Sequence, residues 1–130
     1  MMITTKGRNA LKIMIDLAQH EGEGFISLND VAERQKESLK YLEASAKSLS
    51  QAGLVISARG KSGGYKLARR AEEYTVAEIL LSGEGSLAPV SCLISGCENA
   101  GTCDTLPLFK ELDEVIMNFL TSKSLKDLIK

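Results

Sequence analysis

Histidine is almost absent from this 130-residue sequence, which contains only His20. A catalytic Cys–His or Ser–His pair would need that residue. His20 instead ends an amphipathic segment far from the cysteines in sequence, where an ordinary surface histidine is expected. Segment 60–64 is rich in glycine, yet no helix pattern follows it, so it lacks the arrangement of a phosphate-binding loop. These absences argue against an enzyme.

Long apolar runs are also missing. No run approaches the roughly 20 residues that a membrane-spanning helix needs. The amino terminus, MMITTKGRNALKIMID, lacks the basic, apolar and small-residue order of a secretory signal. We therefore expect a cytoplasmic protein without membrane contact, a setting in which structural disulfides are uncommon. The length suits one domain, or a small domain with an attached dimerisation segment.

Acidic residues are the minority charge in the first half of the chain, and basic residues are the minority charge in the second half. Residues 1–70 contain 12 Lys and Arg against 7 Asp and Glu, a net charge of +5. Residues 71–130 contain 4 against 10, a net charge of −6, so the total of −1 hides an asymmetry. A basic front half favours contact with a polyanion such as nucleic acid, although charges that only face solvent are an alternative explanation.

Two helices are predicted at the start of the basic half. Apolar residues at helical spacing predict an amphipathic helix over 5–20, which Gly22 and Gly24 end. Ser27 is followed three residues later by Asp30, a pattern close to a capping box, and this predicts the start of a short second helix.

A third helix follows after a brief turn. Ser38 can cap it, and residues 51–53 close it. Its apolar positions are Leu39, Leu42, Ala46 and Leu49. A short helix, a tight turn and a longer helix form the helix-turn-helix order, although two facing helices also occur as plain core packing.

The next segment predicts a β-hairpin. Two β-prone runs, 54–58 and 65–68, flank a glycine-rich turn. The loop carries Arg59 and Lys61. A hairpin with a basic tip directly after a helix-turn-helix indicates a winged helix, in which one helix enters the major groove and the loop reaches phosphates or the minor groove. A hairpin that only covers the core is the alternative.

The acidic half is predicted to contain further helices. Residues 75–78 form a capping box that starts a short helix through Leu81. Pro107 suits the first turn of a final long helix, and 124–129 a short capped tail helix. The apolar stripe of the long helix comprises Leu108, Leu112, Val115, Ile116, Phe119 and Leu120. Such a stripe needs a partner surface, which a second copy of the chain in a two-fold dimer or the chain's own first helix can supply.

Several of these segments together resemble one protein family. They are the opening TTKGRNALKIMIDLA, the Tyr-Leu-Glu at 41–43, the hairpin RGKSGGYKLA and the Glu-Gly at 84–85 before a cysteine segment. The sequence resembles the Rrf-type bacterial regulators, which include IscR-like, NsrR-like and CymR-like members, over essentially its whole length. The resemblance implies a homodimeric winged-helix transcription regulator, acting as a repressor on a palindromic double-stranded operator.

The resemblance also implies which residues meet DNA. Recognition-helix residues would face the major groove, with Glu43 as a base-discriminating carboxylate, and Arg59 would enter the minor groove supported by its neighbours. The implied set is Ser38, Lys40, Tyr41, Glu43, Ser57, Arg59, Gly60, Lys61, Gly63 and Gly64. Ala44 departs from the family, which usually has a glutamine there that can hydrogen-bond a base edge. The stretch 44–48 is also smaller and more polar than usual, so DNA readout is expected to depend on shape and phosphate contacts.

All three cysteines lie in CLISGCENAGTC, residues 92–103. In a cytosolic protein, a thiolate cluster in a glycine-containing loop indicates metal or redox chemistry more often than a disulfide framework. Iron–sulfur clusters are held by such thiolates. Cys92, Cys97 and Cys103 are therefore candidate ligands of the iron of a [2Fe-2S] or [4Fe-4S] cluster. Zinc, a thiol switch such as a Cys92–Cys97 disulfide, or a loop without cofactor are the alternatives.

A fourth ligand is not evident from the resemblance. IscR-like members have a histidine three residues after the last cysteine, where this chain has Leu106, and NsrR-like members use an aspartate where this chain has Arg8. The first cysteine gap is also four residues long, not five. Glu98, Asp104, a hydroxyl or an exogenous ligand can fill the position.

The predicted organisation has three parts. They are a winged helix-turn-helix domain over 1–84, a cysteine-bearing sensor loop over 85–105, and a dimerisation helix with its tail over 106–130. The fold is expected to be mainly α-helical with a small β-hairpin. The predicted function is DNA-binding regulation that senses cluster supply, iron, redox state or nitric oxide. A cluster-free CymR-like regulator of cysteine or sulfur metabolism gated by a protein partner, and a small metal-binding protein without DNA binding, are the alternatives.

Overall fold

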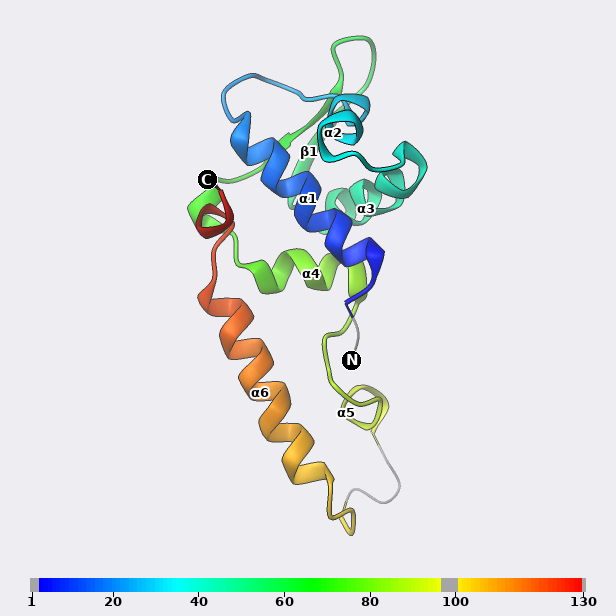
Figure 1. Ribbon diagram of the computed structural model, residues 1–130, viewed down its shortest axis with the longest axis vertical. Coiled ribbons are helices and arrows are strands. Elements are labelled where there is room, and N and C mark those ends of the chain that lie inside the picture. The colour runs from blue at the N-terminus through cyan, green and yellow to red at the C-terminus, as the bar shows by residue number, and fades with distance from the viewer. Residues whose placement is uncertain (1–2, 97–100, 130) are drawn as a thin grey trace.

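The computed structural model describes residues 3–96 and 101–129 of the chain. Most helices and the hairpin form a body at one end of the molecule, while α6 extends away from it with α5 nearby (Figure 1). The elements in chain order are α1 Thr5–Gln19, α2 Leu28–Gln35, α3 Leu39–Gln51, β1 Val55–Ala58, β2 Gly64–Leu67, η1 Ala71–Glu73, α4 Val76–Glu84, α5 Cys92–Ser95, α6 Leu106–Ser122 and η2 Lys126–Leu128. The predicted fold class, a mainly helical winged helix with one hairpin, is confirmed.

The helix-turn-helix pair begins and ends where local side chains favour it. The Oγ of Ser27 accepts a hydrogen bond from the backbone N–H of Asp30 at 3.2 Å, so the predicted cap of α2 is confirmed. Lys36 ends α2 in the left-handed conformation, with φ of 55°. Ser38 is the N-cap residue of α3, but its side chain makes no capping hydrogen bond.

The hairpin is attached to the rest of the body by one extra backbone bridge. Its strands are antiparallel, with Val55 opposite Leu67 and Ala58 opposite Gly64. Ile26 and Tyr65 exchange two N–H···O bonds of 2.8 Å. A Cβ on Gly64 would lie 2.1 Å from the carbonyl oxygen of Ile26, so the bridge can form only with glycine at this position.

Among the described residues, two apolar clusters form the core. The larger joins α1, α2, α3, the hairpin and the tail, and its fully buried members include Ile13, Met14, Leu42, Leu49 and Leu125. The smaller consists of Val76, Leu80 and Leu87, with Met117 and Leu120 of α6 packed against it. The last turns of α6 therefore pack against α4, and Figure 1 shows this end of α6 near α4 while the rest of the helix extends away.

Helix α4 is three residues longer than predicted. The expected capping box is present, because Thr75 Oγ1 accepts from the N–H of Glu78 at 3.1 Å and Glu78 Oε2 accepts from the N–H of Thr75 at 2.9 Å. The helix continues through Gly83, where a Cβ would come within 3.1 Å of the Cα of Gly7. A close approach of α1, invisible in the local sequence, therefore explains this glycine within the helix.

The tail folds back onto the body. Ser124 and Asp127 cap each other as expected, but the turn they begin is a 3₁₀ helix. Leu125 is fully buried in the larger cluster, so the end of the chain belongs to the core of the winged helix. The division of the chain after residues 84 and 105 stays a prediction. No helix in the described part of the chain is long and apolar enough to cross a membrane.

Candidate nucleic-acid interface and cysteine segment

The start of α3 has one face turned to solvent. Ser38, Lys40, Tyr41 and Glu43 are all exposed, and Tyr41 as a residue is 62% exposed. Leu42, on the opposite side, is fully buried. The apolar spacing of α3 therefore seats one face in the core and leaves polar and aromatic side chains free for a partner.

The small residues in the middle of α3 have a packing role. Ser45 is fully buried, and its Oγ donates a 2.8 Å hydrogen bond to the backbone carbonyl of Lys6 in α1. Ala46 is also fully buried, whereas Ala44 is exposed. Of the stretch predicted to alter DNA readout, Ser45 and Ala46 thus face α1 and the core.

The hairpin loop presents cations to solvent. Ser57, Arg59, Gly60 and Lys61 are exposed, and Gly63 is half-buried, as is Gly64. A Cβ on Gly63 would lie 2.3 Å from the carbonyl oxygen of Ala58, so the tight turn requires glycine there. Within the described residues, no carboxylate forms an ion pair with Arg59 or Lys61. Both cations remain available to an anionic partner.

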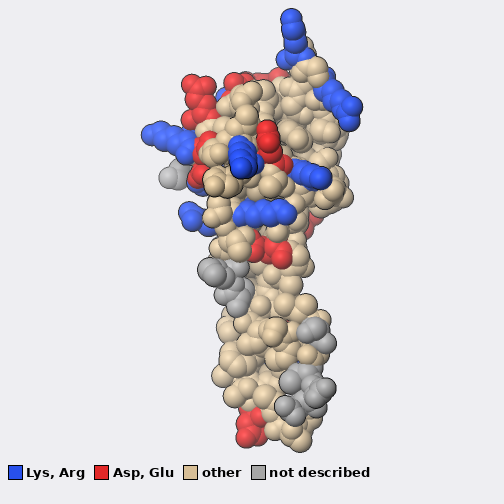
Figure 2. Space-filling model, turned by 90° about the vertical axis from the view of Figure 1, so that its right-hand side faces the viewer, with Lys and Arg blue, Asp and Glu red and all other residues tan. Residues whose placement is uncertain are grey.

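The cations at the base of the hairpin are held by other protein groups. Lys66 Nζ lies 4.7 Å from the centre of the Phe25 ring. Arg69 forms an ion pair with Glu78, and this hydrogen bond raises the pKa of Arg69 above its ordinary value. Figure 2 shows where the cations lie on one face of the molecule. Lys and Arg side chains project at the top, where Figure 1 places the hairpin loop, while the lower part of this face is mostly uncharged.

An ion pair between a buried carboxylate of α1 and an exposed arginine of α2 joins α1 to the helix-turn-helix. Asp16 is 1% exposed, and its two oxygens accept hydrogen bonds from Arg34 Nε at 3.0 Å and Nη2 at 2.7 Å, and from Gln35 Nε2 at 3.2 Å. Burial alone would raise the pKa of Asp16, but these hydrogen bonds, with the charges of Arg34 and His20, hold the pKa below its ordinary value. We call these contacts of Asp16 with Arg34 and Gln35 the Asp16 clamp. The sequence did not lead us to predict it. Its only signal is a carboxylate between the apolar positions of α1.

The described cysteines lie at the ends of their segment. Cys92 begins α5 and Cys103 precedes α6; both are half-buried free thiols. Cys103 Sγ lies 3.2 Å from Thr105 Oγ1, and this contact, with the backbone N–H groups of Thr105 and Leu106, lowers the pKa of the thiol. Cys97, the third predicted ligand, lies outside the described residues, as does Glu98.

The donor chemistry of this segment fits an iron–sulfur cluster. Thiolates are the usual protein ligands of such clusters, and Cys103 lies where the start of α6 favours its thiolate form. Within residues 3–96 and 101–129, no three His, Cys, Asp or Glu side chains lie together as a metal site. Asp104, the described candidate for a fourth ligand, is exposed next to Cys103.

Comparison with known proteins agrees with this architecture. Residues 3–130 match the family model described as Rrf2, iron-dependent transcriptional regulator. The chain belongs to the Rrf2 family. Two curated relatives, both named HTH-type transcriptional regulator IscR, are similar to this chain. The one from Photorhabdus laumondii is 41% identical over 99% of this chain and 79% of its own length. The one from Xenorhabdus nematophila is 42% identical over 100% and 80%.

Solved structures of similar regulators share the fold. CymR, the global cysteine regulator of B. subtilis, is 37% identical, covers 98% of this chain and 95% of its own, and has a TM-score of 0.79. The T. potens IscR is 38% identical with a TM-score of 0.78 over 98% and 85%. The protein is therefore a transcriptional regulator of the IscR/Rrf2 type with a DNA-binding helix-turn-helix, and the prediction that it is no enzyme is confirmed.

Proposed function

We propose that this Rrf2-type regulator binds a palindromic operator as a homodimer through the start of α3 and the hairpin loop. The observation that carries the proposal is the pairing of two exposed features on one body. The solvent-facing start of α3 bears Lys40 and Tyr41, and the hairpin bears Arg59 and Lys61 without ion-pair partners in the described part. A helix that enters the major groove beside a cationic loop is the usual winged-helix arrangement for DNA.

Each proposed DNA contact has a separate role. Lys40 and Lys61 would neutralise phosphates, which strengthens binding to any sequence. Tyr41, Ser38 and Glu43 would face base edges, with Glu43 selecting against bases that lack a donor. Arg59 would enter the minor groove, where a narrow width concentrates negative potential.

The contacts of Ser57, Gly60, Gly63 and Gly64 would be indirect. Ser57 lies on β1 next to the loop, and the glycines let the turn at 59–63 close tightly behind Arg59. These residues would therefore support the position of Arg59 and Lys61 while their backbone stays close to the DNA.

We also propose that the exposed stripe of α6 forms the two-fold interface. Leu108, Val115 and Phe119 are 61%, 64% and 58% exposed, and they recur at helical spacing on the side of α6 that faces away from α4. A second copy of the same stripe would cover them, and the two-fold axis would make the operator palindromic.

The cysteine segment is proposed to set the DNA-binding state. Cys92, Cys97 and Cys103 would hold an iron–sulfur cluster, which supplies a redox- and nitric-oxide-sensitive group when bound. Cys103 lies three residues before Leu106, the first residue of α6, so ordering of segment 92–103 would fix the start of that helix. Through the dimer, the position of α6 would set the spacing of the two α3 helices, which must match half-sites about one DNA turn apart.

A cluster-free regulator is the second candidate. One solved relative, 35% identical to this chain, is the oxidized form of the Staphylococcus aureus CymR. The lowered pKa of Cys103 suits thiol oxidation as well as metal binding. In this case a thiol switch or a protein partner, not a cluster, would gate DNA binding.

Replacement of Arg59 tests the proposed interface. We expect Arg59→Ala to weaken operator binding by about 1–3 kcal/mol and to reduce the slope of log affinity against log salt by roughly one. Fluorescence anisotropy at several salt concentrations measures both quantities. The matched control is Lys110→Ala, which removes an exposed cation from α6 and should leave affinity unchanged. Equal affinity of Arg59→Ala and the unchanged protein would contradict the proposal.

A further inference from the structure

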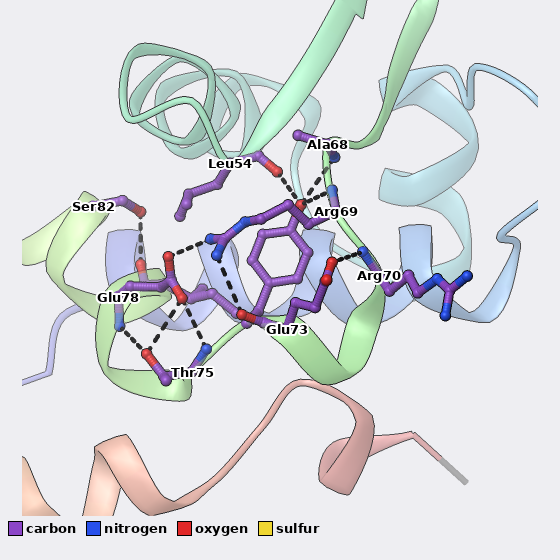
Figure 3. Close-up of polar contacts among 10 residues, drawn as sticks. Leu54, Ala68, Arg69, Arg70, Glu73, Thr75, Glu78 and Ser82 are labelled. Atoms are coloured by element: carbon purple, nitrogen blue, oxygen red, sulfur yellow. Dashed lines mark hydrogen bonds and ion pairs between the residues drawn. The ribbon is translucent and has the colours of Figure 1, made fainter.

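The hydroxyl of one buried tyrosine holds the base of the hairpin together. Tyr74 is fully buried, and its hydroxyl donates a 2.6 Å hydrogen bond to the carbonyl oxygen of Leu54. The same oxygen accepts hydrogen bonds of 2.9 Å from the N–H groups of Ala68 and Arg69. Figure 3 shows these three backbone groups converging on one point.

The three groups lie just outside the two strands. Leu54 precedes β1, and Ala68 and Arg69 follow β2. Direct pairing between the strand ends is weaker at this point, since the N–H of Ala68 lies 3.4 Å from the carbonyl oxygen of Leu54. Tyr74 thus closes the hairpin at the end opposite its cationic loop.

The backbone of the same residue pairs with the tail that follows α6. The carbonyl oxygen of Tyr74 accepts from the N–H of Leu125 at 3.0 Å, and the N–H of Val76 donates to the carbonyl oxygen of Lys123 at 2.8 Å. Thr75 and Ser124 form the bridge between these bonds. The side chain of Leu125 is fully buried in the same apolar cluster as Tyr74. Only one residue, Lys123, separates this bridge from the end of α6.

Charged groups cover the outer side of the tyrosine ring. The guanidinium carbon of Arg69 lies 4.3 Å from the ring centre, and Arg69 Nη1 donates to the carbonyl oxygen of Glu73 at 3.2 Å. Arg69 also pairs with Glu78 of α4 (Figure 3). The strand end is therefore tied to α4 as well as to the tyrosine.

We propose that Tyr74 is a positioning residue for DNA binding, which fixes the hairpin relative to the tail of α6. A two-stranded hairpin is marginally stable on its own, so its orientation depends on what anchors it. The bridge to Ile26 anchors the middle of this hairpin, and Tyr74 anchors its base. Because the backbone of Tyr74 also holds the tail, the orientation of the cationic loop is linked to the position of α6. This inference rests on the proposed role of Arg59 in DNA binding.

A phenylalanine at this position separates positioning from core packing. Tyr74→Phe keeps the ring in the apolar cluster but removes the three hydrogen bonds of the hydroxyl. The N–H of Arg69 loses its partner, and the N–H of Ala68 and the carbonyl of Leu54 keep only their 3.4 Å contact with each other. We expect operator affinity to fall about tenfold, in line with the loss of buried hydrogen bonds. In an Arg59→Ala background the same change should cost less than about twofold, because the mispositioned loop has lost the side chain that reaches DNA.

Hydrogen exchange reports the hairpin directly. Amides of residues 57–64 should exchange several-fold faster in Tyr74→Phe, measured on the free protein by mass spectrometry. Tyr65→Phe is the matched control, since Tyr65 lies on β2 but its hydroxyl makes no hydrogen bond among the described residues. It should leave both affinity and exchange unchanged.

A substitution at the surface of the tail tests the link between the tail and the hairpin. It can also be used if the Tyr74→Phe variant does not fold. Asp127 is exposed, and its Oδ2 accepts from the N–H of Ser124 at 2.9 Å, so Asp127→Ala loosens the tail without touching the hairpin. We expect faster exchange at residues 57–64, whereas Lys126→Ala, a neighbouring exposed control, should have no effect. Unchanged exchange in Asp127→Ala would overturn the link to the tail.

The outcomes distinguish this inference from the proposed function. If Arg59→Ala does not weaken operator binding, the proposed interface is wrong. If Arg59→Ala weakens binding but Tyr74→Phe alters neither affinity nor exchange, the positioning role is wrong while the interface stands. A Tyr74→Phe loss that is equally large in both backgrounds would also overturn the inference, because it would indicate a general loss of stability.

Discussion

Asp16 carries its charge inside the protein, and its contacts explain how that is possible. Arg34 and Gln35 approach the carboxylate from α2 and together donate three hydrogen bonds, which replace the water lost on burial. The pair connects α1 with the first helix of the helix-turn-helix. At the other end of α1, Glu84 has a comparable role at long range, as its oxygen accepts from Thr4 N–H at 3.0 Å and Gly7 N–H at 2.9 Å.

The Asp16 clamp predicts a specific pH dependence. Because its folded-state pKa is lowered, Asp16 contributes stability that is present above its unfolded pKa, near 4, and is lost as pH falls through the folded value. We expect Asp16→Asn to lower the free energy of unfolding by about 1–3 kcal/mol at pH 7 and to flatten its dependence on pH below about 5. Urea unfolding from pH 7 to 3 measures both. The control is Glu33→Gln, which makes the same carboxylate-to-amide change at an exposed position of α2 and should leave the pH dependence of the free energy of unfolding unchanged. If Asp16→Asn showed the same pH dependence as the original protein, the Asp16 clamp would be refuted.

The contact between Glu84 and Gly7 predicts that Gly7→Ala changes stability differently in the presence and in the absence of the Glu84 side chain. A Cβ on Gly7 would lie 2.3 Å from Glu84 Oε1, so Gly7→Ala must displace the carboxylate and its hydrogen bonds to the start of α1. We expect Gly7→Ala and Glu84→Ala each to destabilise the protein, by up to about 2 kcal/mol. In the Glu84→Ala background, Gly7→Ala should be neutral or stabilising by up to about 1 kcal/mol, because alanine favours a helix. A double-mutant cycle measured by urea unfolding tests this. Additive effects of the two substitutions on the free energy of unfolding would contradict the proposed coupling between Gly7 and Glu84.

At the scale of elements, two segments differ in how they present their side chains. Helix α3 leaves its polar start in solvent and buries its middle against α1 through Ser45 and Ala46. The cysteine segment instead contains a helix of only four residues, α5, and places Cys103 against the first N–H groups of α6. The chemistry proposed for the second segment can be tested independently of DNA binding.

The proposed cofactor predicts a visible spectrum. Protein purified without oxygen should absorb in the visible range and contain iron and sulfide, because thiolate-bound clusters are coloured. Cys92→Ala, Cys97→Ala and Cys103→Ala should each abolish the absorption, whereas Lys110→Ala on α6 should retain it. Absorption spectra with metal analysis measure this. Colourless, iron-free protein that still binds operator DNA would favour the cluster-free candidate.

At the scale of the molecule, α6 separates two surfaces. Its inner face, through Met117 and Leu120, packs on the smaller apolar cluster with α4, while Leu108, Val115 and Phe119 remain exposed. A helix of this length, about 25 Å, exposes a stripe too continuous for a surface that only meets solvent. A second copy of the chain is the occupant we propose.

Charge on this stripe should separate the copies. We expect Val115→Glu to convert the dimer to monomer and to weaken operator binding at least about tenfold, because each copy would lose the partner that occupies the second half-site. Thr121→Glu is the matched control, since it adds the same charge to α6 away from the stripe. Analytical ultracentrifugation measures the mass. A Val115→Glu protein that sediments as the unchanged protein would show that the stripe is not the interface.

Features carried by neighbouring residues were predictable from the sequence alone. The helical spacing of α1 and α3, the capping box at 75–78, the hairpin with its glycine-rich turn and the exposed cations of the loop all follow from local periodicity and local hydrogen bonds. The membership of the Rrf2 family followed from motifs of the same kind.

Features that join distant residues were decided only by the tertiary structure. Glu84 and Gly7 are 77 residues apart, Ser45 and Lys6 are 39 apart, and Tyr74 pairs with a tail that no local pattern places beside it. Gly83 within α4 and the packing role of Ser45 in α3 depend on how closely these two helices approach α1. The physical reason is that a side chain's spacing shows which face it occupies, whereas its partner depends on how whole elements pack.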